Sequence, residues 1–416
     1  MHFLSLLVYN IAIFCYGLGI FIASIFTRKS YAWISGRKYW RCRLMEVDFK
    51  PGKRIWFHCA SLGEFEQARP LIEKWRSTRP DDVIILTFFS PSGFEIRQNY
   101  AHADLVTYLP LDTPRNARDF IARIKPDIAF FVKYEFWYNH ITRLKELNVP
   151  VILFSAVFRP GQVFFKWYGG MFRKLLGNYA AIFVQNEESK TLLQGIGISS
   201  TMAPDTRFDR VYHVAQNHKQ FPAIEKFKGS SKILIAGSTW QHDEDLLLKC
   251  IEENILPGYK YIIAPHNIKH TRIEQLVSSI KVRAHKFSDL TEANAAETDV
   301  VVINNIGNLS SLYAYGDIAY IGGGFNASVH NVLEAAVYKI PVLFGPNFQK
   351  SEEAKDLIAL GMGFCVTDYP NLQKNIRYAA SHLVTDELNK VKLEKYIVSH
   401  LGGTEQIFKA AQPFLR

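Results

Sequence analysis

The chain has 416 residues, of which 48% are hydrophobic and 21% are charged, and this is the composition of a globular protein. That length exceeds one ordinary hydrophobic core, so two domains are expected. The net charge of +10 favours an anionic partner, such as nucleic acid, anionic lipid or a phosphorylated substrate. The five cysteines form no Cys-x-x-Cys pair and no His-Glu-x-x-His occurs, which argues against a disulfide framework or a zinc site.

The first apolar segment, residues 3–26, carries no charged side chain. As a helix it would be roughly 36 Å long, enough to cross a bilayer core of about 30 Å. Basic residues follow this segment and do not precede it, unlike in a secretory signal peptide. We therefore expect an uncleaved single-pass anchor (1–27) with the folded domains in the cytoplasm. The alternatives are a cleaved signal and a helix lying in the interface, and the basic, aromatic segment 28–50 suits lipid headgroups.

From residue 54 onward, apolar runs alternate with amphipathic patterns such as 65–77 and 137–147. Continuous Val, Ile and Phe runs separated by helices predict a parallel sheet covered on both faces. The polar stretch 216–231 predicts a linker between two similar α/β domains, 51–215 and 232–416, with a cleft between them. The predicted strands are 54–60, 83–89, 105–109, 128–134, 151–157 and 180–185, then 232–237, 260–264, 299–303, 317–321 and 341–344.

Three strand ends of the second domain carry unusual turns. They lie in AGSTWQHDED (236–245), APHNIKH (264–270) and YIGGGFNASVHNVLEAA (320–336). Glycines let backbone N–H groups approach a phosphate, and a helix N-terminus favours an anion. Glycines 322–324 alone are more typical of a tight turn, but three such ends in one domain favour nucleotide binding. Neither Gly-x-Gly-x-x-Gly nor a P-loop motif occurs, so dinucleotide and P-loop sites are not expected.

Two acids and one cation follow strands of the first domain. In HCASLGEF, Ser61 could cap a helix whose dipole would stabilise Glu64. This is ordinary helix-start chemistry, but the same dipole keeps an acid ionised, as a general base requires. Glu66 is the rival acid and points elsewhere on the helix. Glu135, in VKYEFWYN, ends another strand, and Arg207 could either be solvated or neutralise a leaving phosphate.

Eight motifs together resemble the 3-deoxy-D-manno-octulosonic acid (Kdo) transferases, a glycosyltransferase family of GT-B type with two Rossmann-like domains. They are HCASLGEFEQARPLI, SPSGFE, KYEFWYNHI, AGSTWQHDED, APHNIKH, IGNLSSLYAYGDIAYIGGG, HNVLEAA and PVLFGPNFQ. The motifs run in family order over almost the whole chain, anchor included. Such an ordered set is more specific than any single motif.

The resemblance implies a role for each matched position. Glu64 matches the family's general base for the acceptor hydroxyl, Glu135 a second functional acid, and Arg207 a cationic position. The CMP of CMP-Kdo would contact nine residues of the second domain: Pro265, His266, Ile306, Gly307, Asn308, Asn331, Val332, Leu333 and Glu334. The chain departs from the family pattern at Arg207 (usually Lys), His266 (usually Arg), Asn308 (usually an acid) and Val332 (usually Pro).

The implied reaction moves Kdo from CMP-Kdo to a lipid A precursor in lipopolysaccharide biosynthesis, at the inner membrane. No metal or other cofactor is implied, since CMP-Kdo is a substrate. Anionic membrane lipids are expected partners. Nucleic acid is not, because the basic residues are spread out and no recognition module is evident. The alternatives are a GT-B transferase or epimerase using another sugar nucleotide, and a membrane-tethered binding protein without turnover.

Overall fold

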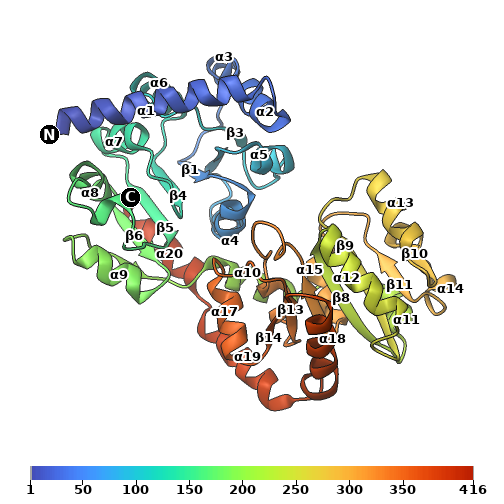
Figure 1. Cartoon of the computed structure of the whole chain (residues 1–416). Helices are drawn as coiled ribbons and strands as arrows, with labels where there is room; N and C mark the ends of the chain where they lie inside the picture. Colours follow the sequence, from blue (N-terminus) through green and yellow to red (C-terminus); the bar gives the residue numbers. More distant parts are fainter. Residues whose placement is uncertain (1, 416) are drawn as a thin grey trace. The chain divides into compact units, whose positions relative to one another are not determined.

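The computed structural model describes residues 2–415, which divide into two compact units. Unit 1 contains the chain up to Asp209 and again from His400, and unit 2 comprises Arg210–Ser399. Each unit is an open, seven-stranded parallel sheet with helices packed on it (Figure 1). The predicted α/β class with two Rossmann-like domains is confirmed.

The sheet of unit 1 has the strand order β3-β2-β1-β4-β5-β6-β7. All six predicted strands are present, and the structure adds the two-residue β7. The strands are β1 (Arg54–Cys59), β2 (Val83–Phe88), β3 (Leu105–Tyr108), β4 (Ile128–Val132), β5 (Val151–Ala156), β6 (Ala181–Val184) and β7 (Thr201–Met202). The helices are α1 (His2–Ala23), α2 (Arg28–Arg37), α3 (Trp40–Met45), α4 (Leu62–Thr78), α5 (Pro91–Arg97), α6 (Pro114–Ile124), α7 (Tyr138–Glu146), α8 (Gly170–Leu176), α9 (Glu187–Gln194) and α20 (Gly403–Ala411).

Both faces of this sheet are buried, as its continuous apolar strands require. Side chains alternate along β1, so Trp56 packs into the core on one face, and Ile55 and Phe57 pack into the core on the other. The second core also contains Trp75 of α4. The sheet therefore forms a rigid base whose strand-end turns can hold side chains at fixed positions.

The C-terminal residues differ from the predicted second domain, 232–416, because residues from His400 onward belong to unit 1. Helix α20 carries an apolar stripe that includes Ile407 and Phe408, and this stripe is buried in the core beside α4. The ring of Phe408 lies 5.2 Å from that of Trp75, edge to face. The predicted linker is likewise not all irregular, because its middle forms helix α11, which buries an Ile and a Phe.

The sheet of unit 2 has the order β10-β11-β9-β8-β12-β13-β14, and all five predicted strands are present. The strands are β8 (Lys232–Thr239), β9 (Tyr259–Pro265), β10 (Ala284–Lys286), β11 (Val300–Val302), β12 (Ile318–Ile321), β13 (Val342–Phe344) and β14 (Gly363–Cys365). The helices are α11 (Pro222–Lys228), α12 (Gln241–Glu252), α13 (His270–Ser279), α14 (Glu292–Ala295), α15 (Leu309–Leu312), α16 (Leu333–Ala336), α17 (Glu352–Ala359), α18 (Tyr369–Tyr378) and α19 (Glu387–Ser399), while α10 (Thr206–Gln216) runs from unit 1 into unit 2.

Helix α1 lies along one side of unit 1 (Figure 1). Its segment Leu4–Ala23 is long and apolar enough to cross a membrane, and only a small share of it is fully buried. One side of the helix is nevertheless bonded to the domain. Tyr9 donates a hydrogen bond of 2.6 Å to Asp112, and Asn10 accepts one of 3.0 Å from Asn139. The outward side is apolar and includes Leu4, Leu7, Val8, Ile11, Phe14, Leu18 and Phe21.

One basic residue of the expected headgroup segment, Arg37, is buried instead. Its guanidinium lies 3.7 Å from the centre of the Trp33 ring and donates to the backbone oxygens of Leu109 (2.8 Å) and Phe89 (2.6 Å). Burial lowers the pKa of Arg37 to about 9, because the charged form loses water. Arg37 therefore holds α2 on the domain, whereas its neighbour Lys38 is exposed.

Candidate active site

The strand order of unit 1 reverses between β1 and β4, which pair in the middle of the sheet. In an open parallel sheet, ligands bind beyond the carboxyl ends of the strands at such a switch point. Glu64 lies on the helix that follows β1, and Glu135 lies in the turn that follows β4. Burial first, then these two carboxylates, raise the pKa of Cys59 at the end of β1. Both predicted acids therefore flank the switch point.

Glu64 occupies the first turn of α4, as predicted. The hydroxyl of Ser61, the N-cap residue, accepts the backbone N–H of Gly63 (3.2 Å) and donates to the Glu64 carboxylate. Glu64 remains partly exposed. Glu66, the rival acid, instead accepts a hydrogen bond of 3.0 Å from Arg97. The ion pair compensates the charge of Glu66, whereas the Ser61 hydroxyl that bonds Glu64 is neutral, so Glu64 is the better candidate for a base.

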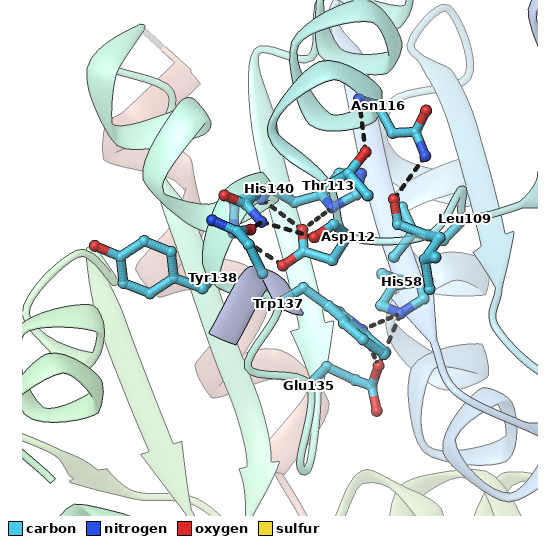
Figure 2. Close-up of polar contacts among 12 residues, drawn as sticks. His58, Leu109, Asp112, Thr113, Asn116, Glu135, Trp137, Tyr138 and His140 are labelled. Carbon is cyan, nitrogen blue, oxygen red and sulfur yellow. Dashed lines mark hydrogen bonds and ion pairs between the residues drawn. The ribbon is translucent and has the colours of Figure 1, made fainter. Parts of the chain in front are cut away.

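Glu135 is buried and held by two rings (Figure 2). Its Oε2 atom lies 2.8 Å from Nε2 of His58 and accepts a hydrogen bond of 2.5 Å from Nε1 of Trp137. Its backbone oxygen accepts one of 2.9 Å from the hydroxyl of Tyr179. The carboxylate is thus fixed in place, and sequence reasoning gave no role to these three partners.

Arg207 is neither a solvated surface residue nor an unpaired cation. Its guanidinium donates two hydrogen bonds, of 3.0 and 2.9 Å, to the carboxylate of Asp205. The same buried carboxylate accepts a hydrogen bond of 2.7 Å from the side-chain amide of Gln67, which lies one turn beyond Glu64 on α4. Arg207 is therefore connected to the helix that carries Glu64, and Asp205 neutralises part of its charge.

Unit 2 has an equivalent switch point between β8 and β12. Asp243, fully buried near the start of α12, holds the turns that follow both strands. It accepts hydrogen bonds from the backbone N–H of Trp240 (2.9 Å), the backbone N–H of Gly323 (3.2 Å) and the hydroxyl of Tyr320 (2.8 Å). One carboxylate thereby fixes the two turns that the sequence marks as candidate nucleotide contacts.

The glycines after β12 allow close packing of the protein's own loops. A Cβ atom on Gly322 would lie 2.4 Å from the backbone oxygen of Ser238, and one on Gly324 would lie 2.6 Å from the backbone of Gly345. Gly323 has a φ of +90°, which favours glycine. These contacts agree with the tight-turn interpretation, and a phosphate cradle at this loop stays a prediction.

The predicted contact His266 lies in a stack of three rings directly after Pro265, the last residue of β9. The rings of Trp240 and His330 both lie nearly parallel to that of His266, with their centres 4.6 Å and 4.8 Å from it. Trp240 also donates a hydrogen bond of 3.2 Å to Nε2 of His330. An indole can only donate, so His330 Nε2 bears a lone pair. Burial lowers the pKa of His266, and burial together with His266 lowers that of His330 to about 4.

The remaining predicted contacts form a second group. Glu334 accepts a hydrogen bond of 2.7 Å from the hydroxyl of Ser310, which lies at the start of α15. It accepts a second one of 3.3 Å from the side chain of Asn331. Asn308 is the residue before that helix, Gly307 has a φ of +93°, and Ile306 is exposed. Val332 and Leu333 are buried, so their side chains are not accessible to a ligand. His330 precedes Asn331, which places this group beside the ring stack.

Trp240 and His330 carried no sequence signal of their own. Each lies in a quoted motif, but their contact depends on β8 and β12 being neighbours, which only the strand order reveals. Among residues 2–415, no group of three or more His, Cys, Asp or Glu side chains is arranged to hold a metal ion. The expectation that no metal is needed stays a prediction.

We expect Asp205→Asn to destabilise unit 1 in a pH-dependent way. Burial alone would raise the pKa of Asp205, but Arg207 and the other donors outweigh it and hold the pKa at about 2. Since this lies below the unfolded value of about 3.9, the carboxylate stabilises the fold above pH ~4, by about 2 kcal/mol, and this is lost as the pH falls toward 2. Denaturant unfolding at several pH values measures the difference. The exposed Glu188→Gln should change stability by less than about 0.5 kcal/mol, and a pH-independent effect of Asp205→Asn would contradict the account.

Comparison with known proteins covers most of the chain. Residues 38–210 match the family model described as "3-Deoxy-D-manno-octulosonic-acid transferase (kdotransferase)". A 3-deoxy-D-manno-octulosonic acid transferase from Aquifex aeolicus is 28% identical over 325 residues, covering 76% of this chain and 83% of that protein. A bifunctional glycosyltransferase/methyltransferase from Fusobacterium nucleatum is 25% identical over 388 residues, covering 85% of this chain and 59% of that protein.

A solved structure agrees with the predicted fold. The UDP-GlcNAc 2-epimerase from Neisseria meningitidis, bound to UDP-GlcNAc, has a TM-score of 0.53 at 14% identity, covering 84% of this chain and 99% of that chain. This likeness shows the fold alone, and the family relationship depends on the sequence matches. Together they establish that the chain is a glycosyltransferase of GT-B fold related to the Kdo transferases.

Proposed function

We propose that the chain transfers Kdo from CMP-Kdo to a lipid A precursor, lipid IVA, in lipopolysaccharide biosynthesis. The main support is that residues 38–210, the part matched by the Kdo transferase family, contain Glu64, Glu135 and Arg207. Two of these three residues flank the switch point of the first sheet, where an open parallel sheet binds its ligands. The reaction needs a base that takes a proton, and the carboxylate of Glu64 at the start of α4 can serve as that base.

In the proposed reaction, Glu64 accepts the proton of the acceptor hydroxyl. The oxygen forms a bond to the anomeric carbon of Kdo while the bond from that carbon to the phosphate of CMP breaks. Glu135 and Arg207 support the charge that develops around this centre. Because Asp205 already binds the guanidinium of Arg207 in a bidentate pair, Arg207 would act from a fixed position.

The donor nucleotide is proposed to bind unit 2. Glu334, held by Ser310 and Asn331, has the acceptor chemistry for ribose hydroxyls. His266 stands where the family usually has Arg, and burial lowers its pKa and so favours the neutral ring. We therefore propose that His266 contacts the nucleotide by stacking or a hydrogen bond, without supplying a fixed positive charge.

The decisive assay is transfer to a tetra-acylated lipid A precursor, with the product identified by its mass. We expect transfer from CMP-Kdo and none from UDP-N-acetylglucosamine. Glu64→Gln keeps the shape but cannot accept the proton, so turnover should fall about 100-fold or more. Glu66→Gln, on the same turn, is the matched control and should retain most activity. Undiminished transfer by a folded Glu64→Gln protein would remove the proposed role of Glu64.

The N-terminal helix is proposed to bind the protein to the inner membrane, with exposed basic residues near it drawing anionic lipid. The single-pass arrangement expected from the sequence competes with a helix lying in the interface. Tyr9 and Asn10, in the middle of α1, are hydrogen-bonded to the folded domain. In a spanning helix these bonds would draw the buried carboxylate of Asp112 to hydrocarbon depth, which is costly. The contacts therefore favour the interfacial arrangement, with the apolar side of α1 in lipid.

Cysteine labelling in membrane vesicles separates the two arrangements. Ser5→Cys and Ser24→Cys lie near opposite ends of α1 and are introduced singly after the exposed Cys15 and Cys42 are replaced by Ser. For an interfacial helix, both should react with an impermeant maleimide from the same side as the catalytic domains. Reaction of Ser5→Cys only from the opposite side would establish the spanning arrangement.

A further inference from the structure

We propose that His58 is a positioning residue that holds Glu135 through a shared proton and thereby sets its orientation and charge during transfer. The proposal rests on the proposed function in one respect, namely that Glu135 acts in the reaction. His58 belongs to the HCASLGEF motif, but the sequence alone gives it no role. It lies on β1 and Glu135 follows β4, so the pair bridges the two strands of the switch point.

The first argument is the geometry between the imidazole and the carboxylate (Figure 2). His58 is fully buried, Glu135 is 7% exposed, and Nε2 of the ring lies 2.8 Å from Oε2 of the acid. At this distance one proton must lie between the two atoms, because two lone pairs would repel each other. The indole N–H of Trp137 lies 3.2 Å from the same Nε2 and 2.5 Å from the same Oε2. Trp137 can donate to Oε2 in either case, because this oxygen keeps a free lone pair whether or not it carries the shared proton.

The second argument concerns the other ring nitrogen. Nδ1 of His58 lies 2.9 Å from the hydroxyl oxygen of Thr87. That oxygen also accepts a hydrogen bond of 2.8 Å from the indole N–H of Trp56. The hydroxyl hydrogen can point to Nδ1, or to the backbone oxygen of Phe57 at 3.3 Å. In the first case Nδ1 accepts, and in the second it donates. Thr87 therefore satisfies the ring in either state, so His58 can hold or release a proton without a broken hydrogen bond.

A buried histidine that only fills the core would need no acid partner at the switch point. Here the acid is surrounded by other groups that respond to its charge. Burial and then the Glu135 carboxylate raise the pKa of Tyr179, whose hydroxyl bonds the Glu135 backbone. Burial first, and then Glu64, Glu135 and Glu66, raise the pKa of Cys59. Two further titratable groups interact electrostatically around the acid: Tyr16 of α1 interacts with Glu135, and Arg37 of α2 interacts with Tyr16.

The structure supplies a matched control in the same view. His140 is also fully buried and has a carboxylate partner, Asp112, whose Oδ1 lies 2.5 Å from His140 Nδ1 (Figure 2). Asp112 further accepts the backbone N–H groups of Asn139 and His140, both at 2.9 Å. This pair fixes the start of α7 and includes neither predicted acid. His140→Gln should therefore cost stability without changing how the transfer rate depends on pH.

The kinetic experiment compares His58→Gln, Glu135→Gln, the double variant and His140→Gln over a range of pH. Gln at position 58 can donate a hydrogen bond but cannot titrate. We expect kcat to fall about tenfold in His58→Gln, with the KM for CMP-Kdo within about twofold and a changed pH profile. The same substitution should cost less than about twofold when Glu135 is already Gln. Additive losses, or the unchanged pH profile expected of His140→Gln, would overturn the proposal.

A second measurement does not depend on activity. Nitrogen-15 NMR of the imidazole shows which ring nitrogen carries the proton. We expect Nε2–H in the wild-type chain at neutral pH, and Nδ1–H in Glu135→Ala, because Trp137 then donates to Nε2. The same ring state in both proteins would overturn the shared proton. If the ring state switches but Glu135→Gln transfers Kdo at full rate, the pairing stands and the proposed role of Glu135 fails.

Discussion

The reversal of strand order in each sheet is the constraint on which the candidate site depends. Connections leave neighbouring strands in opposite directions at β1 and β4, and again at β8 and β12, and open parallel sheets bind their ligands beyond the carboxyl ends of such strands. The turns that follow those strands lie at these ends. Glu64 and Glu135 follow the first pair, and Trp240 and the Gly322–Gly324 run follow the second. The fold therefore assigns chemistry to turns that are far apart in the sequence.

Buried carboxylates hold those turns rigid. Asp112, Asp205 and Asp243 are each almost or fully inaccessible to water, and each accepts several hydrogen bonds from donors on different elements. Burying a charge is costly unless it is paired and hydrogen-bonded, and these donors offset that cost. Removing one partner would leave a buried charge uncompensated. The turns that carry Glu135 and Trp240, and the start of α10 that carries Arg207, are thus fixed before any ligand binds.

Much of this architecture follows from the sequence, because the eleven apolar runs are long and buried on both faces. The structure adds β7, β10 and β14, which have two or three residues and lie at or near sheet edges, where no apolar run is required. The placement of α20 depends on its fit to α4, which local pattern does not encode. Glu64 was predictable because its motif is local. The contacts of His58 with Glu135 and of Trp240 with His330 were not, because each joins turns that meet only once strand order is known. Arg37 looked like a headgroup residue, since burial cannot be read from charge alone.

The central claim is that the two switch points divide the work, with the acids on unit 1 and the donor nucleotide on unit 2. Backbone amide exchange of the full chain with and without CMP tests it most directly. The account predicts slower exchange in the turns after β8, β9, β11 and β12, including 265–268, 306–311 and 330–334, and little change around 61–66 and 133–139. Slower exchange confined to the unit 1 turns, or no change at saturating CMP, would contradict it.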